Sequence, residues 1–394
     1  MARVSTSALN LFADPIQLTK DLVDIPSPSH HEKEIADAIE TALRGLKDAT
    51  GAELEVARFG NTVCARTNRG HASRVVLAGH IDTVPIADNV PHHIATNDEG
   101  EEVMWGCGTT DMKSGMAVYL HAFAELVAGD RAGELAHDLT LIAYECEEVS
   151  MEYNGLAHLQ QDNPEWLEGD LALLGEPTGG IIEAGCQGTI RIRVTAHGTR
   201  AHSARAWLGS NATHTLAKTM AYLNEYTPRE VTIDECTYKE GINIVKLESF
   251  VATNTIPDIA WMFVNFRFAP DRSTDEAMAH LLEVLHLEPS QERPYDQRDE
   301  LAEPGAVTFE VDDVASAAMP GLGQPAARAL VEAVGGNFRA KYGWTDVARF
   351  SEMGVPAVNF GCGDPGFAHK VDEQCPVSQI TSVAGELMQY LTSK

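Results

Sequence analysis

Short runs of apolar residues alternate with helical periodicity in the first half of the chain and near its end. Runs that begin near Arg74, Asp138, Asp170 and Val355 have the length and composition of buried strands. Between the first two runs, residues 110–127 place apolar side chains three and four positions apart, which predicts a helix. Buried strands that alternate with amphipathic helices predict an α/β layer with a mostly parallel sheet between helices.

The middle of the chain follows a different pattern. Residues 189–198, TIRIRVTAHG, alternate apolar and polar positions, as a strand with one exposed face does. The elements predicted after it are a helix, two strands, a helix and a strand, near residues 211–226, 242–250, 259–268, 274–287 and 306–313. This β-α-β-β-α-β order is the ferredoxin-like pattern. We therefore expect a second domain at 187–314, inserted into a first domain made of residues 1–186 and 315–394.

The length and charge of the chain narrow the classes of protein to which it can belong. Its 394 residues exceed one ordinary core, which favours two domains. A net charge of −29 argues against nucleic acid or an anionic membrane as a partner. The first residues lack the apolar segment of a secretion signal, and no apolar run approaches the ~20 residues that span a bilayer. We expect a cytoplasmic protein.

The seven cysteines form an odd set without a C-x-x-C pair. Such spacing fits neither a disulfide framework nor a structural zinc knuckle. We interpret them as reduced, partly buried residues. A catalytic cysteine, Cys107 or Cys146 with a distant histidine, is an alternative that no motif supports.

Histidines and carboxylates occur where the predicted strands end, which is where open α/β sheets bind ligands. The candidates are, in chain order, His80, Asp82, Asp111, Glu147, Glu148, Glu176 and His369. His80 and Asp82 are two positions apart in extended chain, so their side chains point the same way, and the carboxylate can fix the tautomer of a metal-binding imidazole. Asp111 begins the predicted helix, where the backbone dipoles favour an anion.

A subset of these side chains makes a ligand set for two divalent cations, provided that one carboxylate bridges them. The set is His80, Asp111, Glu148, Glu176 and His369. Nitrogen and oxygen ligands without a thiolate fit zinc best, with cobalt or manganese as substitutes. Glu147 is left over and can take a proton from a metal-bound water, whose pKa the metal lowers toward ~7. The pattern therefore predicts metal-assisted hydrolysis of a carbonyl compound.

Each of these features alone has a simpler interpretation. A single histidine is more often a surface or core residue, and the pair Glu147 and Glu148 alone would more often be surface charge. We expect Glu145 to point away from the site, because adjacent positions of an extended segment alternate. The joint placement of all the candidates at one edge of one sheet favours a metal site.

Five short motifs resemble, in the same order, those of the M20 family of dizinc amidohydrolases and peptidases. They are GHIDTVP, GCGTTDMKSGMA, ECEE, GEPT and AHK. The resemblance covers essentially the whole chain, including the inserted segment. It implies a zinc-peptidase-like catalytic domain with an inserted lid and dimerisation domain, and therefore a homodimer.

The resemblance also implies a role for each matching residue. It assigns the ligands of two zinc ions that share a bridging carboxylate: His80, Asp111 and Glu176 for one, and Glu148 and His369, with Asp111, for the other. Asp82 orients His80, and Glu147 is the general base. His202, in RAHSAR, corresponds to a histidine that reaches across the dimer to stabilise the tetrahedral oxyanion. The peptide bond between Asp111 and Met112 is expected to be cis.

The segments 184–216 and 341–350 are most similar to those of actinobacterial family members that hydrolyse N-succinyl-LL-2,6-diaminoheptanedioate to succinate and LL-diaminopimelate, in lysine and cell-wall precursor biosynthesis. That substrate carries several carboxylates, so cationic and hydrogen-bonding side chains should line the cleft. The candidates are Asn254, Arg205, Arg267, Thr345 and Arg349. The chain departs from many such relatives at Gln187 and Arg205, where they have arginine and tyrosine.

Two other hypotheses remain open at this point. The same metal site would serve a deacylase of N-acetylornithine or another N-acyl-amino acid, or a carboxypeptidase. A non-catalytic metal-binding or regulatory protein would keep the ligands without turnover. The presence of Glu147 beside a complete ligand set argues against this last alternative.

Overall fold

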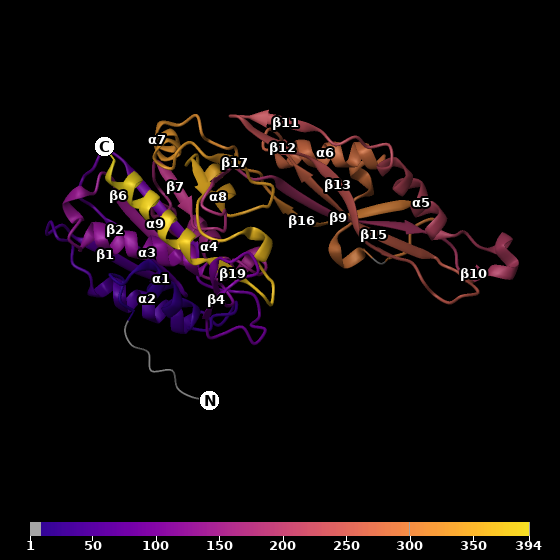
Figure 1. Ribbon diagram of the computed structural model, residues 1–394. Coiled ribbons are helices and arrows are strands. Elements are labelled where there is room, and N and C mark those ends of the chain that lie inside the picture. The colour runs from indigo at the N-terminus through magenta and orange to yellow at the C-terminus, as the bar shows by residue number, and fades with distance from the viewer. Residues whose placement is uncertain (1–8, 299, 394) are drawn as a thin grey trace. The chain divides into compact units, whose positions relative to one another are not determined.

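The computed structural model describes residues 9–298 and 300–393 (Figure 1). Its internal contacts divide the chain into two compact units. The first unit contains the described residues up to Ala184, together with Pro320–Arg339 and those from Arg349 onward, and the second contains Gly185–Met319 and Ala340–Ala348. The predicted division into a discontinuous first domain, 1–186 and 315–394, and an inserted domain, 187–314, stays a prediction.

The first unit is built on a mixed eight-stranded sheet of order β1-β2-β6-β3-β7-β18-β8-β17. The strands are β1 Leu54–Phe59, β2 Thr62–Thr67, β3 Arg74–His80, β6 Asp138–Tyr144, β7 Leu171–Leu174, β8 Ile182–Ala184, β17 Phe338–Ala340 and β18 Ala357–Asn359. The four central strands β6, β3, β7 and β18 run parallel, as their continuous apolar runs predict. Their carboxyl ends therefore meet at one edge of the sheet.

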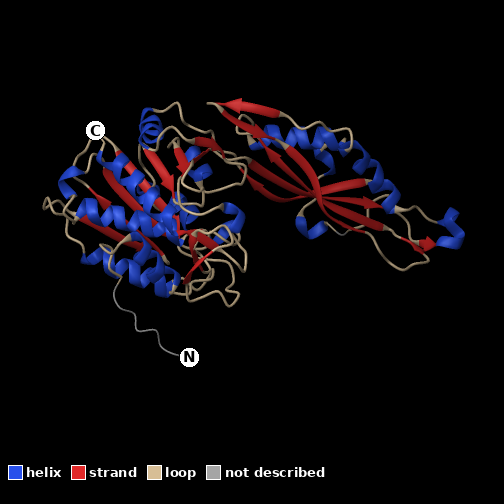
Figure 2. Ribbon diagram, in the orientation of Figure 1, coloured by secondary structure: helices blue, strands red, loops and turns tan. Residues whose placement is uncertain are grey.

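Helices and a smaller sheet complete the first unit (Figure 2). The helices are α1 Pro15–Val23, α2 Lys33–Gly45, α3 Lys113–Val127, α4 Gly155–Asp162, α7 Pro325–Ala333, α8 Val347–Glu352 and α9 Val377–Thr392. Helix α3 is buried along nearly its whole length, because it packs against β3 and β6 on one side and against α1 and α9 on another. A three-stranded sheet of order β19-β5-β4 joins β19 Gln374–Pro376 to β5 Glu102–Trp105 and β4 His93–Thr96. This pairing carries the segment after His369 to the loop that precedes α3.

The second unit has the predicted β-α-β-β-α-β order. Its antiparallel sheet has the order β13-β15-β9-β16, with β9 Gly188–His197, β13 Gly241–Glu248, β15 Ile259–Phe268 and β16 Val307–Ala315. Helices α5 Ala212–Leu223 and α6 Thr274–Leu285 pack on one face of it. Alternate residues of β15, such as Met262, Val264 and Phe266, are fully buried in the core between sheet and helices. The intervening residues face the other side, as the period of two requires.

Two short antiparallel ribbons extend the second unit. Strand β10, Ala201–His202, pairs with β14, Thr255–Ile256, and β11, Glu230–Ile233, pairs with β12, Cys236–Lys239. Across the described parts of both units, no helix combines the length and apolar character that crossing a membrane requires.

Candidate metal centre

His80 and Asp82 link the end of β3 to the loop after β6. His80 is fully buried, and its Nδ1 lies 3.4 Å from Asp82 Oδ1. The two carboxylate oxygens of Asp82 also accept the backbone N–H groups of Glu147, at 3.0 Å, and Glu148, at 3.1 Å, and the hydroxyl of Ser29 donates to Oδ2 at 2.8 Å. Burial alone would raise the pKa of Asp82, but the hydrogen bond with His80 and these donors hold it below its usual range. Asp82 thus positions the ring of one candidate ligand, His80, and the backbone of a second, Glu148, together with that of Glu147.

Asp111 stands at the start of α3, after a turn that one buried carboxylate holds in place. Glu373 accepts the backbone N–H groups of Gly108 at 3.0 Å, Thr110 at 2.8 Å and Asp111 at 2.9 Å. Burial raises the pKa of Glu373 to about 7. The peptide bond between Asp111 and Met112 is cis, as predicted. Sequence reasoning missed Glu373, although it lies four residues after His369.

The candidate ligands gather in two groups that share Asp111. His80, Asp111 and Glu176 offer ligand atoms within 4.8 Å of one another, and so do Asp111, Glu148 and His369. His80 Nε2 lies 3.0 Å from Asp111 Oδ1, and His369 Nε2 lies 3.4 Å from Asp111 Oδ2. One carboxylate with an oxygen toward each histidine has the arrangement of a bridging ligand. The donor set, two imidazoles and three carboxylates without sulfur, fits a pair of divalent cations of the zinc type.

The site is buried on one side and open on the other. Glu176 and His80 are buried, whereas the side chain of His369 is 55% exposed. His369 Nε2 lies 2.8 Å from Glu148 Oε2, and the contacts with Asp111 and Glu148 raise the pKa of His369 to about 10. The His369 side of the centre is therefore the side that solvent reaches.

Glu147 and Glu145 take different positions, although only one residue separates them. Glu147 lies within reach of His80 and Glu148, since ligand atoms of the three lie within 4.8 Å, but it belongs to neither group around Asp111. Glu145 is turned elsewhere, because its Oε1 accepts the backbone N–H of Asn61 at 2.8 Å. Residues two positions apart on extended chain would share a side, so strand alternation does not explain this difference. The chain turns at Cys146, whose φ is 57°, and this turn separates the two carboxylates.

The alternative of a catalytic cysteine gains no support. All seven cysteines are buried and free. Burial raises the pKa of the Cys107 thiol, and burial together with a hydrogen bond to Glu32 raises that of Cys146 to about 12. A thiol of that kind is protonated near neutral pH and is a poor nucleophile.

The second unit holds most of the predicted substrate residues, and it brings one of them, Asn254, close to the predicted oxyanion stabiliser His202. His202 lies opposite Thr255 in the ribbon of β10 and β14, and the N–H of Ser203 donates to the backbone oxygen of Asn254 at 2.9 Å. His202 is exposed, and its Nδ1 accepts the N–H of Ala204 at 3.0 Å. The imidazole is thereby oriented with Nε2 directed away from its own backbone.

The other predicted substrate residues are more scattered. Arg267 is the last residue but one of β15 and lies opposite Thr189, and burial lowers its pKa. Arg205 is exposed in the short helical turn after His202, while Thr345 is buried in the second unit. Arg349 is buried in α8, in the first unit.

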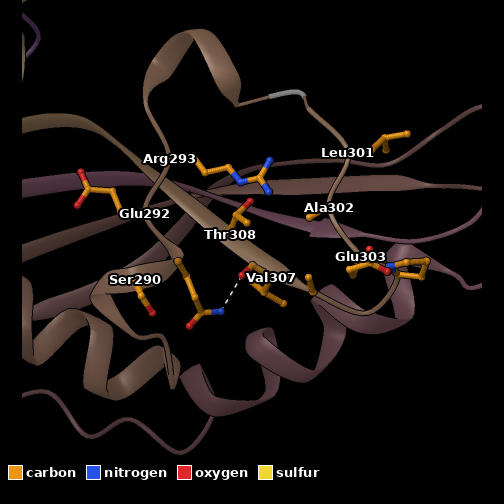
Figure 3. Close-up of a pocket in the computed structure, with 11 residues that line it drawn as sticks. Ser290, Glu292, Arg293, Leu301, Ala302, Glu303, Val307 and Thr308 are labelled. Atoms are coloured by element: carbon orange, nitrogen blue, oxygen red, sulfur yellow. Dashed lines mark hydrogen bonds between the residues drawn. The ribbon is translucent and has the colours of Figure 1, made fainter.

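A cavity in the second unit lies apart from these residues. Its volume is about 630 Å³, and Ser290, Arg293, Leu301, Glu303 and Thr308 contribute to its lining (Figure 3). The predicted metal, catalytic and substrate residues do not appear in that lining. This cavity therefore does not coincide with the candidate site.

Comparison with known proteins decides the family. Residues 76–393 match the family model described as peptidase family M20/M25/M40. The chain belongs to this family. Its M20 relatives include a succinyl-diaminopimelate desuccinylase of Corynebacterium glutamicum, 59% identical over 385 residues that make up 98% of each chain. A Mycobacterium tuberculosis protein provisionally named as the same enzyme is 50% identical over 97% of this chain and 99% of its own.

Solved structures of the M20 type share the fold. An aminopeptidase from Bacillus cereus superposes with a TM-score of 0.73 at 18% identity, covering 98% of this chain and 99% of its own. A Bacillus subtilis M20 peptidase described as binding a dinuclear metal superposes with a TM-score of 0.64 at 15% identity, covering 97% and 98%. The predicted α/β fold of the family is thus confirmed.

Proposed function

We propose that the chain hydrolyses the amide bond of N-succinyl-LL-2,6-diaminoheptanedioate, releasing succinate and LL-diaminopimelate. The observation that carries the proposal is the 59% identity, over 98% of both chains, to a relative named succinyl-diaminopimelate desuccinylase. The two ligand groups around Asp111 supply a site suited to amide hydrolysis. Seven free cysteines support a reducing compartment, and we place the reaction in the cytoplasm.

We further propose that the two groups around Asp111 hold two zinc ions. His80 and Glu176 would bind one ion and Glu148 and His369 the other, with Asp111 on both; cobalt or manganese would substitute. When bound, such cations supply Lewis acidity that lowers the pKa of water and polarises the scissile carbonyl. Asp82 keeps the His80 ring oriented through Nδ1, which leaves Nε2 directed at Asp111.

Glu147 is the proposed general base. It would remove a proton from the attacking water as the oxygen bonds to the carbonyl carbon, and then deliver that proton to the amide nitrogen as the C–N bond breaks. Succinate and a free amine result, so the proton count balances. Asp82 fixes the backbone of Glu147 through its N–H, which favours a constant position for the carboxylate during both transfers.

His202 is the proposed oxyanion stabiliser, acting through Nε2 on a second copy of the chain. Its exposure on a short ribbon of the second unit, with Nδ1 already engaged, supports that role. Asn254 lies beside it and would bind the substrate, with Arg267, Arg205, Thr345 and Arg349 as the proposed partners of its carboxylates.

The substrate proposal is tested by following amide cleavage by the zinc-loaded protein. N-succinyl-LL-diaminopimelate and N-acetylornithine are supplied separately, each with and without a chelator. We expect chelator-sensitive release of succinate and little release of acetate. Cleavage of the acetyl compound alone would refute the proposed substrate and keep the metal chemistry, whereas inactivity toward both with two metals bound would favour a peptidase or a non-catalytic protein.

The second unit has an edge suited to pairing with another copy. Strand β13 is an edge of the four-stranded sheet, and Val245 and Leu247 on it are 59% and 48% exposed, followed by Phe250 at 77%. An edge strand presents unpaired backbone groups to which a second chain can add, and the exposed apolar side chains of β13 offer surface to bury in such a contact. These exposed residues support a homodimer through the second unit.

Leu247→Lys should weaken this dimer, because a charge would be placed in an apolar contact. We expect light scattering to show a shift from dimer to monomer, and amidase activity to fall with it if His202 acts across the dimer. Val314→Lys is the matched control on the opposite edge strand, β16, where Val314 is 37% exposed. A Leu247→Lys protein that stays dimeric would contradict the proposed interface.

A further inference from the structure

A third group of ligand-type side chains lies outside the two groups that share Asp111. Glu32, Glu145 and Cys146 offer ligand atoms that all lie within 4.8 Å of one another. His30 flanks the group, since its Nδ1 lies 3.6 Å from the sulfur of Cys146. Two segments far apart in the sequence, residues 30–32 and 145–146, therefore meet through polar side chains.

Glu32 is the member of the group whose buried carboxylate is only partly hydrogen-bonded. It is fully buried, at 0% exposure. Its Oε1 accepts the N–H of His30 at 2.8 Å and the thiol of Cys146 at 3.2 Å, while its buried Oε2 has no hydrogen-bond partner. Leaving a carboxylate oxygen buried without a partner is costly, and a cation would remove that cost.

The spacing of the group suits a zinc-like ion. Zinc binds thiolate sulfur at about 2.3 Å and carboxylate oxygen at about 2.0–2.2 Å, so a sulfur and an oxygen on one tetrahedral ion lie roughly 3.5 Å apart. The Cys146 sulfur and Glu32 Oε1 are 3.2 Å apart, close to that separation. A thiolate beside carboxylates selects zinc, cobalt or another thiophilic ion over magnesium or calcium.

We propose that Glu32, Glu145 and Cys146 form a third divalent-cation site, selective for thiophilic ions. On binding, the cation replaces the thiol proton of Cys146, which leaves to solvent, and no oxidation or reduction is involved. The exposed His30 is the nearest additional nitrogen ligand. Occupancy would tie the residue that directly precedes Glu147 to the loop at 30–32. The proposal stands on these side chains and does not depend on the substrate.

Cobalt provides a test that separates this site from the metal centre around Asp111. A cobalt–thiolate bond gives a near-ultraviolet charge-transfer band, whereas a centre of nitrogen and oxygen ligands gives none. We expect the cobalt-loaded full chain to show this band and to bind about three cobalt ions. Cys146→Ser should remove the band and lower the count to about two, while Cys236→Ser, at a buried cysteine of β12, should change neither.

Glu32→Gln is the second variant. It tests the same site independently, in case Cys146→Ser does not fold. Glutamine keeps a carbonyl oxygen for the N–H of His30 but lacks the charge, so cobalt titration of the band should show at least a tenfold loss of affinity. Circular dichroism checks that each variant is folded. The absence of the band in the wild-type protein, its survival in Cys146→Ser, or unchanged affinity in Glu32→Gln would each overturn the proposal.

Discussion

Glu147→Gln is expected to lower kcat on the succinyl substrate by about 10²–10⁴-fold, the range typical of a lost general base. Glutamine has nearly the same shape but cannot accept the proton of the attacking water. Glu147 belongs to neither ligand group around Asp111, so metal content should stay at the wild-type value. Steady-state kinetics and metal analysis on the same preparation check both parts.

Glu152→Gln is the matched control for that variant, because Glu152 is a nearby exposed glutamate that belongs to none of the groups of ligand-type side chains. It should keep kcat within a few-fold of the wild type. Loss of metal from Glu147→Gln, or equal losses of kcat in both variants, would show that Glu147 acts in binding cations or in holding the loop.

Removing the metals with a chelator is expected to abolish activity and lower the thermal unfolding midpoint. The carboxylates of Asp111, Glu148 and Glu176 lie close together around the two histidines, and bound cations offset their mutual repulsion. Because the cations bind the folded chain in preference to the unfolded one, their loss removes binding free energy from the folded state. Differential scanning calorimetry and activity assays before and after chelation measure the two effects.

Readdition of zinc should restore both properties, and magnesium should not, since imidazole ligands disfavour it. Asp111→Asn provides the matched genetic experiment, because it weakens the carboxylate shared by the two groups. Full activity in a preparation shown to be free of metal would refute the proposed chemistry.

The local pattern of apolar and polar residues was sufficient to predict the main strands and helices and the candidate metal ligands. The four central strands of the first unit are buried on both faces, so each has a continuous apolar run in the sequence. His80 is the last residue of β3, and Glu148 lies four residues after the end of β6. The strands of the second unit have one face toward the helices. Buried and less buried residues therefore alternate along β15. Where buried positions recur regularly along a strand or helix, apolar residues recur in the sequence with the period of that element.

Contacts between distant segments could not be predicted in the same way. Glu373 reaches the turn before Asp111 across 262 residues, and the pairing of β19 with β5 that brings it there involves only three residues of each strand. The bond from Ser29 to Asp82 has no periodic signal either. Such polar contacts depend on the complete tertiary arrangement, which a single sequence does not display.

The dependence of the Asp111 turn on Glu373 also has a consequence for biosynthesis. The ribosome makes His80 and Asp111 first, whereas the carboxylate that holds the turn follows 262 residues after Asp111, shortly after the histidine that completes the second ligand group. A nascent chain that has already buried much of its first sheet therefore still lacks part of its cation site. We therefore expect full metal loading only after Glu373 has been made, and a chain cut short before residue 369 to be inactive rather than weakly active.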